Sequence, residues 1–189
     1  MNAITIFPSV VIRACCFHYS KNVWKKAKQL DLTKDAITQR HVRLSALLPL
    51  LPRKFISEGW CYIMEDCPDT DAIQTFNDYM VSQWLENESF VDIWCVHGER
   101  HRTTNAIESW HKKLNSAVPK NANLYQLLNV LKEDADLQRV VVTQYKSNAP
   151  PAKRCAQTTI MKNSWITYVT DQLLKNKISV GHCLEKLRV

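Results

Sequence analysis

The sequence predicts a mostly α-helical protein with one buried strand near its start. Only three of the 189 residues are glycine, fewer than a sheet-rich fold with many tight turns usually needs. Apolar residues also recur at helical spacing through most of the chain. Residues 10–17 (VVIRACCF) form the one exception, because a nearly continuous apolar run after a proline is typical of a strand covered on both faces. No second run of this kind follows, so its partner strands are expected to come from sequence outside this chain.

The other elements are predicted from apolar spacing and from the prolines that end them. The first helix has Ser20 as its N-cap and buries Val23, Trp24 and Ala27 on one face. The sequence does not decide whether residues 90–96 form a helix or a strand. Residues 147–153 are predicted to be a linker. Helices are predicted over residues 19–30, 35–48, 54–64, 71–85, 102–117, 124–145, 165–174 and 180–187.

Two of these helices carry apolar stripes that are expected to be buried. The stripe of residues 102–117 consists of Ile107, Trp110 and Leu114. The inner face of residues 124–145 consists of Leu124, Leu127, Leu128, Leu131 and Ala135. Trp24, Trp110 and Trp165 are each expected to lie in the core, since each has apolar neighbours at helical spacing.

Composition narrows the class of protein. With 46% apolar and 23% charged residues, the chain has the balance of one globular domain. No run approaches the roughly 20 apolar residues that cross a bilayer, and the start lacks the features of a signal peptide. We therefore expect a soluble intracellular protein without a membrane partner. Seven cysteines at irregular spacing are then expected to be reduced thiols.

The net charge of +7 suits a polyanionic partner, although charge alone specifies none. Lys21, Lys25 and Lys28 form a basic row on one face of the first helix. Such a row is usually only a solvated surface. It becomes a DNA-contacting surface if the fold presents it beside a nucleic-acid channel.

Cys15 and His18 form a C-x-x-H pair where the predicted strand passes into the first helix. A zinc site needs about four ligands, and the nearest cluster, Cys95, His97 and His101, is remote in sequence. A structural pair is therefore favoured, and no metal site is predicted in this chain.

Glu108 also has two interpretations. Its spacing from Asn105 is that of a capping box, in which the carboxylate reaches back to the amide of the cap residue. The functional alternative is a metal-binding carboxylate at a helix start, with His111 on the same face.

Two ordered motifs resemble eukaryotic Mutator-like (MULE) transposases. The segment ACCFHYSKNVWKKAKQLDL is similar to the family's C-x-x-H strand and following helix. The segment IWCVHGERHRTTNAIESWHKKLNSAV is similar to its R-T-x-N-x-x-E-x-W-H segment. Between them, RLSALLPLLP resembles the family's leucine-rich helix before a paired proline, and NLYQLLNVLKED falls where the family places a helix. The resemblance covers about residues 1–145.

The resemblance implies a C-terminal fragment of a ribonuclease-H-like fold that cuts and joins DNA with two aspartates, one glutamate and divalent Mg or Mn. Cys15 and His18 then match the family's C-x-x-H, and Glu108 matches its third acid. The other matched motif residues are Arg102, Thr103, Asn105, Trp110 and His111. Residues 1–146 would be a partial transposase domain with a helical insertion at about 31–97, followed by a linker and helical tail over 147–189.

The chain departs from the family at one decisive point. Both family aspartates precede the C-x-x-H, and the fourteen residues before Cys15 contain no Asp or Glu. Glu108 alone cannot hold two metal ions around a scissile phosphate. The expectation is a protein derived from a transposable element, nuclear by resemblance, inactive in DNA transposition, with weak non-specific DNA binding and no cofactor of its own. The alternatives are an incomplete gene model of an active transposase, or a host-recruited protein-interaction module with unknown protein partners.

Overall fold

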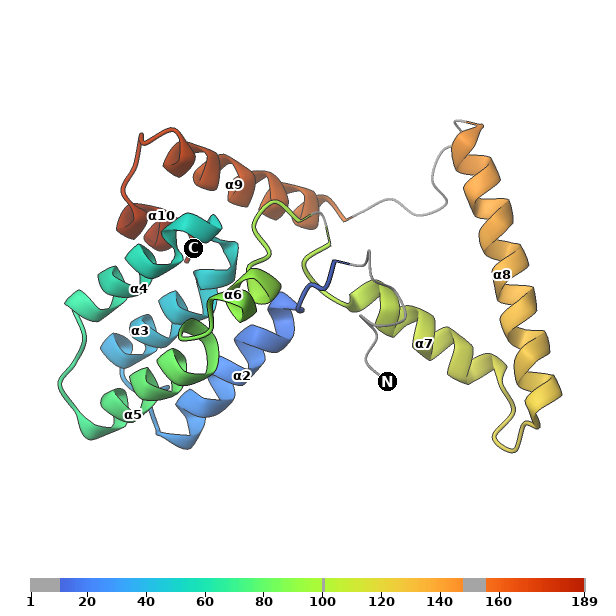
Figure 1. Ribbon diagram of the computed structural model, residues 1–189, viewed down its shortest axis with the longest axis horizontal. Helices are drawn as coiled ribbons and strands as arrows, with labels where there is room; N and C mark the ends of the chain where they lie inside the picture. The colour runs from blue at the N-terminus through green and yellow to red at the C-terminus, as the bar shows by residue number, and fades with distance from the viewer. Residues whose placement is uncertain (1–10, 100, 148–155, 189) are drawn as a thin grey trace. The chain divides into compact units, whose positions relative to one another are not determined.

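A computed structural model describes residues 11–99, 101–147 and 156–188, and every regular element in these ranges is helical. The mostly α-helical prediction is therefore confirmed. The helices divide into two compact units (Figure 1). The first holds the described residues up to Thr103 and from Met161 onward, and the second runs from Thr104 to Ile160. The predicted domain boundaries near residues 31, 97 and 146 stay predictions.

The first unit contains most of the helices. Between residues 35 and 85 the bounds of the helices agree with the predicted ones to within a few residues. Residues 90–96, for which the sequence does not decide between helix and strand, lie mainly in a helix. Short 3₁₀ turns, η1 (Leu48–Leu50) and η2 (Arg53–Phe55), follow α3, and a π-helical turn, η3 (Val81–Leu85), extends α5. The α-helices are α2 (Cys16–Gln29), α3 (Ala36–Leu47), α4 (Ile56–Glu65), α5 (Asp71–Met80), α6 (Glu88–Trp94), the part of α9 (Gln157–Leu174) from Met161 onward, and α10 (Val180–Leu187).

The predicted strand at residues 10–17 is wrong over the part of it that the structure describes. Residues 11–15 form no bridge, and α2 already begins at Cys16, so Ser20 lies inside the helix rather than at its cap. Val11 is 69% exposed, not buried. A strand needs a neighbour for its backbone groups. Here two single bonds take that place, from the Ala14 amide to the carbonyl of Ile93 near the end of a helix at 2.8 Å and from the Cys16 amide to the Arg102 carbonyl at 2.9 Å.

The core of the first unit forms around aromatic side chains. Trp94 is fully buried, stacks on Tyr19 with ring centroids 5.0 Å apart, and donates its indole N–H to the Trp84 carbonyl. Tyr19 donates its hydroxyl to the Ser45 carbonyl at 3.1 Å, which joins α2 to α3. The polar tips of Trp94 and Tyr19 thus keep partners while their rings are removed from water. Among the three tryptophans expected in the core, Trp24 is half-buried, whereas Trp165 is 43% exposed.

The C-terminal helix α10 packs against α3 and α4 in this unit (Figure 1). Gly181 allows the close approach, because a Cβ there would collide with the ring of Tyr62 on α4. Arg40 on α3 donates to the Glu185 carboxylate on α10 at 2.8 Å. Contacts far apart in sequence therefore hold the C-terminus to the helices at the start of the chain.

The second unit is built from α7 (Asn105–Ala117) and α8 (Leu124–Lys146). Asn123 and Gln126 form a capping box that begins α8. No residue of either helix is buried, so the predicted burial of both stripes is wrong for the chain as described. Trp110 is 37% exposed and Leu124 67% exposed. A helical period marks where an apolar stripe lies, but it does not supply the surface that covers it.

Two further observations bear on the described residues only. None of their helices combines the length and the apolar character needed to cross a membrane. The six cysteines among them are free thiols. The predicted linker falls almost entirely at residues 148–153, outside the described ranges.

Candidate nucleic-acid interface

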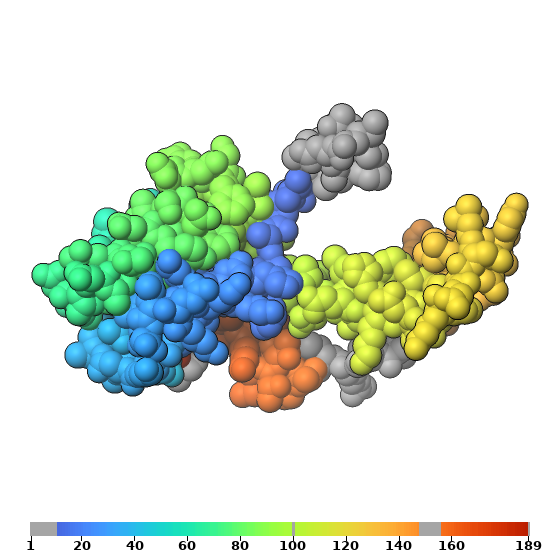
Figure 2. Space-filling model, turned by 90° about the horizontal axis from the view of Figure 1, so that it is seen from below, coloured from blue at the N-terminus to red at the C-terminus, as the bar shows by residue number. Residues whose placement is uncertain are grey.

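The basic row of α2 lies on the outer face of the first unit. Val23 and Ala27 turn one side of α2 into the core, which directs Lys21, Lys25 and Lys28 toward solvent. All three lysines are exposed, and none of them makes an ion pair with another described residue. Figure 2 shows the surfaces of α2 and α3, in dark and light blue, side by side on one face. The solvated face predicted from sequence is confirmed.

A hollow of about 210 Å³ opens beside this row, between α2, α3 and the end of α10. We call it the Trp24 hollow. Ser20 donates its hydroxyl to the Ala46 carbonyl at 3.2 Å, a bond that ties α2 to α3 next to it. The indole N–H of Trp24 makes no hydrogen bond to another described residue. The hollow is lined by Ser20, Trp24, Arg43, Ala46, Leu47 and Arg188.

Positive charge exceeds negative charge around the Trp24 hollow. Arg43 is exposed and forms no ion pair within the described part of the chain. Arg188 donates its Nε to Glu185 at 2.9 Å, and the same carboxylate also accepts from Arg40. A guanidinium has five N–H donors, so most of those on Arg43 and Arg188 remain available. Sequence analysis missed both arginines, because only the packing of α3 and α10 against α2 places them near the lysine row.

The C-x-x-H pair lies at the start of α2. Cys15 is the half-buried N-cap residue, and His18 is exposed in the first turn. Neighbouring Cys16 is half-buried, and this burial raises the pKa of its thiol, so the thiol stays protonated at neutral pH. Among the residues that the structure describes, no three His, Cys, Asp or Glu side chains are grouped as a metal would require.

The more distant Cys95 and His97 contact the segment after α3 instead. The Cys95 thiol donates to the Leu51 carbonyl at 3.4 Å. His97 bonds to the Leu50 carbonyl through Nδ1 at 3.2 Å, and the carbonyl can only accept, so Nδ1 carries the proton. Burial lowers the pKa of His97, which keeps the ring neutral at physiological pH. These two side chains therefore anchor a loop.

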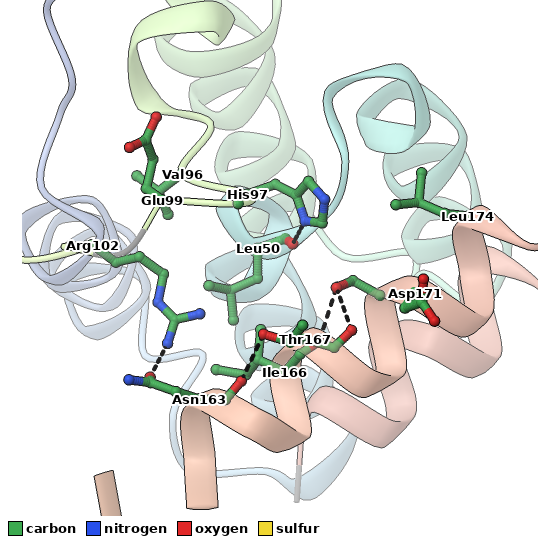
Figure 3. A pocket seen from close by; sticks show the side chains of 12 residues that line it. Leu50, Val96, His97, Glu99, Arg102, Asn163, Ile166, Thr167, Asp171 and Leu174 are labelled. Atoms are coloured by element: carbon green, nitrogen blue, oxygen red, sulfur yellow. Dashed lines mark hydrogen bonds between the residues drawn. The ribbon is translucent and has the colours of Figure 1, made fainter. Parts of the chain in front are cut away.

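Arg102, the first residue of the second family motif, lines a pocket of about 340 Å³ in the first unit (Figure 3). Its guanidinium donates to the side-chain oxygen of Asn163 on α9. Leu50, Val96 and Ile166 supply apolar walls. The two carboxylates of the lining are already paired, Glu99 with Arg13 at 2.9 Å and Asp171 with Lys175 at 2.7 Å. The bond from Arg102 to Asn163 thus holds α9 to the loop that contains Arg102. The carboxylates that line the pocket are already occupied by ion pairs with basic side chains.

The remaining motif residues, apart from exposed Thr103, belong to the second unit. The N-cap of α7 is Thr104 rather than Asn105, so Glu108 is the fourth helical residue and the predicted capping box does not form. Instead the Thr104 hydroxyl donates to the Glu108 carboxylate at 2.8 Å. Asn105, Glu108 and His111 are all exposed.

Trp110 serves a structural purpose in this unit. Its indole N–H donates to the Asp134 carboxylate on α8 at 2.8 Å, and Lys113 donates to the other oxygen at 2.9 Å. The bond from Lys113, supported by that from Trp110, lowers the pKa of Asp134. The R-T-x-N-x-x-E-x-W-H motif therefore includes a contact that holds α7 to α8. Comparison with known protein families, curated proteins and solved structures finds no match to the chain.

Proposed function

We propose that this chain derives from the C-terminal part of a Mutator-like transposase domain and binds DNA through the lysine row of α2. One observation carries the proposal: Lys21, Lys25 and Lys28 point together into solvent without acidic partners among the described residues. Their spacing spans two helical turns, roughly 10 Å along the axis, so they can reach successive phosphates of one strand. The two ordered motifs support the family, and the family in turn supports a nuclear location.

The binding is expected to be weak and independent of sequence. Contacts to phosphates carry no base information, and non-specific dissociation constants are about 10⁻⁴–10⁻⁶ M at physiological salt. Release of counterions makes such binding fall steeply as salt rises. Each lysine that contacts a phosphate contributes about 0.9 to the slope of log affinity against log salt concentration.

Fluorescence anisotropy of a labelled duplex, read between about 50 and 200 mM salt, tests this proposal. Replacing Lys21, Lys25 and Lys28 by Gln is expected to weaken binding and to reduce the salt slope by about 2–3. The matched control replaces Lys54, Lys162 and Lys177 by Gln, which removes the same charge from exposed positions on other elements. Equal losses in the two triple variants would show that net charge alone drives binding, and the assignment to α2 would fail.

The proposal includes no strand cleavage or joining by this chain alone. Two of the family's three acids have no counterpart among its 189 residues, and phosphoryl transfer by paired metals needs several carboxylates. Incubation of supercoiled plasmid with Mg²⁺ or Mn²⁺ is therefore expected to give no nicks. Reproducible nicking that disappears in Glu108→Gln would instead favour the active-transposase alternative.

The second candidate is a protein-interaction module, and the exposed apolar side chains of α8 are the observation that favours it. Leu124, Leu128 and Tyr145 are each more than half exposed. The duplex titration separates the two classes. A folded chain that binds no duplex even at low salt would remove the DNA proposal and leave the interaction module.

A further inference from the structure

The Trp24 hollow combines an aromatic wall with cations in a way that the lysine row alone does not. Trp24 is half-buried and lines the hollow, with Arg43 and Arg188 also in the lining. Bases of single-stranded nucleic acid bind proteins by stacking on aromatic rings, while basic side chains follow the backbone. Arginine adds to such sites, because its planar guanidinium stacks and also donates to phosphate.

We propose that the Trp24 hollow binds an unpaired base of single-stranded nucleic acid, with the adjoining phosphates on the lysine row. The inference rests on the proposed DNA-binding function and extends it from the phosphates to the bases. A base inside a duplex has both faces covered by its neighbours, so only an unpaired base can present a face to the indole. The indole N–H of Trp24 has no partner among the described residues and can donate to a base or phosphate oxygen.

The geometry of α2 allows one strand to use both features. Trp24 and Lys28 are four residues apart, and Lys21 lies three residues before Trp24, so these side chains lie on neighbouring parts of one helix surface. The only described carboxylate that pairs with an arginine of the hollow is Glu185, and it is shared between Arg188 and Arg40. The hollow therefore keeps an excess of positive charge at the end of the lysine row.

A second half-buried tryptophan provides a matched control. Trp60 on α4 also lines a hollow, but that hollow is bordered by Asp78 and Glu86 and contains no cation. A nucleic-acid strand is repelled by this charge. Trp24→Leu and Trp60→Leu therefore remove the same ring from hollows of opposite charge within one unit.

Anisotropy titrations with labelled oligothymidylate, oligouridylate and duplex DNA test the inference on the full chain. Stacking of one base is expected to strengthen single-strand binding about 5- to 150-fold. Trp24→Leu is expected to lose this factor on the single strands and to leave duplex binding unchanged, whereas Trp24→Phe restores most of it. Trp60→Leu is expected to bind like the parent protein. Equal affinity for the two single strands means that the hollow distinguishes neither the 2′-hydroxyl nor the 5-methyl group, as expected for stacking.

The outcomes separate this inference from the function on which it rests. If Trp24→Leu keeps its single-strand affinity while duplex binding still depends on the lysine row, the base-binding proposal for the hollow is wrong and the DNA-binding proposal stands. If the parent protein binds no nucleic acid, both proposals are wrong. Displacement of the strand by polyglutamate as readily as by unlabelled oligonucleotide overturns the hollow in favour of an acidic peptide site. If circular dichroism shows that Trp24→Leu is unfolded, Arg43→Gln replaces it: this variant is expected to weaken single-strand binding more than duplex binding, and equal losses on the two contradict the proposal.

Discussion

The two compact units are built from helices with similar amphipathic patterns, but they differ in what covers the apolar faces. In the first unit, α2 buries Tyr19, Val23 and Ala27 against neighbouring helices. In the second unit, α8 is the longest described helix and has no buried residue. The units therefore draw on different sources of stability: tertiary packing in the first, and capping, helix propensity and a few polar contacts in the second.

The difference shows that an apolar stripe and a core are separate properties. Leu124, Leu128 and Leu131 recur at spacings that place them along one side of α8, and all three are exposed. Exposed apolar stripes of this length mark a surface whose burial against a partner would lower the free energy of the protein. Substitutions of matched residues in the two units are therefore expected to change the free energy of unfolding by different amounts.

The largest contrast is expected from removing one tryptophan in each unit. Trp94 is fully buried and hydrogen-bonded, so Trp94→Ala should lower the free energy of unfolding by about 3–5 kcal/mol. Trp110→Ala should cost only a small part of that, because its ring is already in contact with water. Urea unfolding followed by circular dichroism measures both. Equal costs would show that Trp110 is covered in solution, and the two units would then not differ in how far their apolar side chains are buried.

The next effect concerns the attachment of α10 to the first unit. Gly181→Ala places a methyl group where the Tyr62 ring lies, and overpacking of this kind costs about 1–3 kcal/mol. Alanine is also the better helix former by up to about 1 kcal/mol, so the net loss is smaller than the clash alone. Thermal unfolding measures it, with Ser109→Ala on α7 as the control, since Ser109 is exposed and the substitution there changes helix propensity only. A rise in Tm for Gly181→Ala would mean that α10 is not packed against α4.

Sequence periodicity predicted most helices correctly, because their stripes, caps and prolines are local signals. The helix over residues 35–48 is an example: Asp35 caps α3 through the amides of Ile37 and Thr38, and Pro49 comes two residues after the end of α3. The strand at residues 10–17 failed for a different reason. Val11 and Ile12 have strand propensity, but a strand exists only through its neighbours, and none of the described residues provides one.

The candidate interface was predictable only in part. Lys21, Lys25 and Lys28 share a face on any helix, so local spacing was sufficient to group them. Arg43 and Arg188 come from α3 and α10, and no local pattern indicates that these helices meet beside Trp24. The N-cap of α7 was misplaced by one residue because Thr104 and Asn105 are both residue types that favour caps.

A smaller, pH-dependent effect is expected in the first unit. His41 is buried and bonds through Nε2 to the Asn77 side-chain oxygen at 2.8 Å. Burial lowers its pKa below the ordinary value of 6.5, against the opposing effect of that hydrogen bond. The unfolded chain then binds the proton more readily than the folded one, so stability is complete above pH 6.5 and falls as the pH drops from 6.5 toward the lowered pKa.

Urea unfolding at about pH 5 and pH 7.5 measures this dependence. His41→Gln keeps a donor to Asn77 but does not titrate, so it should be less stable overall and should lose less stability on acidification. Some dependence should remain, because burial also lowers the pKa of His97. Stability that is identical at the two pH values in the parent protein contradicts the burial of both rings.

The smallest expected effect compares the same cap residue in the two units. Asn87 accepts from the Phe90 amide at 3.2 Å and caps α6, while Asn123 accepts from the Gln126 amide at 3.0 Å and caps α8. Substitution of either by Ala should cost roughly 0.5–1 kcal/mol, the lower part of the range for losing a cap. In α6 the buried Val91 and Trp94 hold the helix in place, so Asn87→Ala should lower the unfolding midpoint and leave the helix content unchanged. In α8 no buried side chain opposes fraying, so Asn123→Ala should reduce helical ellipticity and speed amide exchange in the first turns. Slow exchange there in the Asn123→Ala variant would show that the apolar stripe of α8 is covered after all, and its exposed leucines would then belong to an interface of the protein in solution.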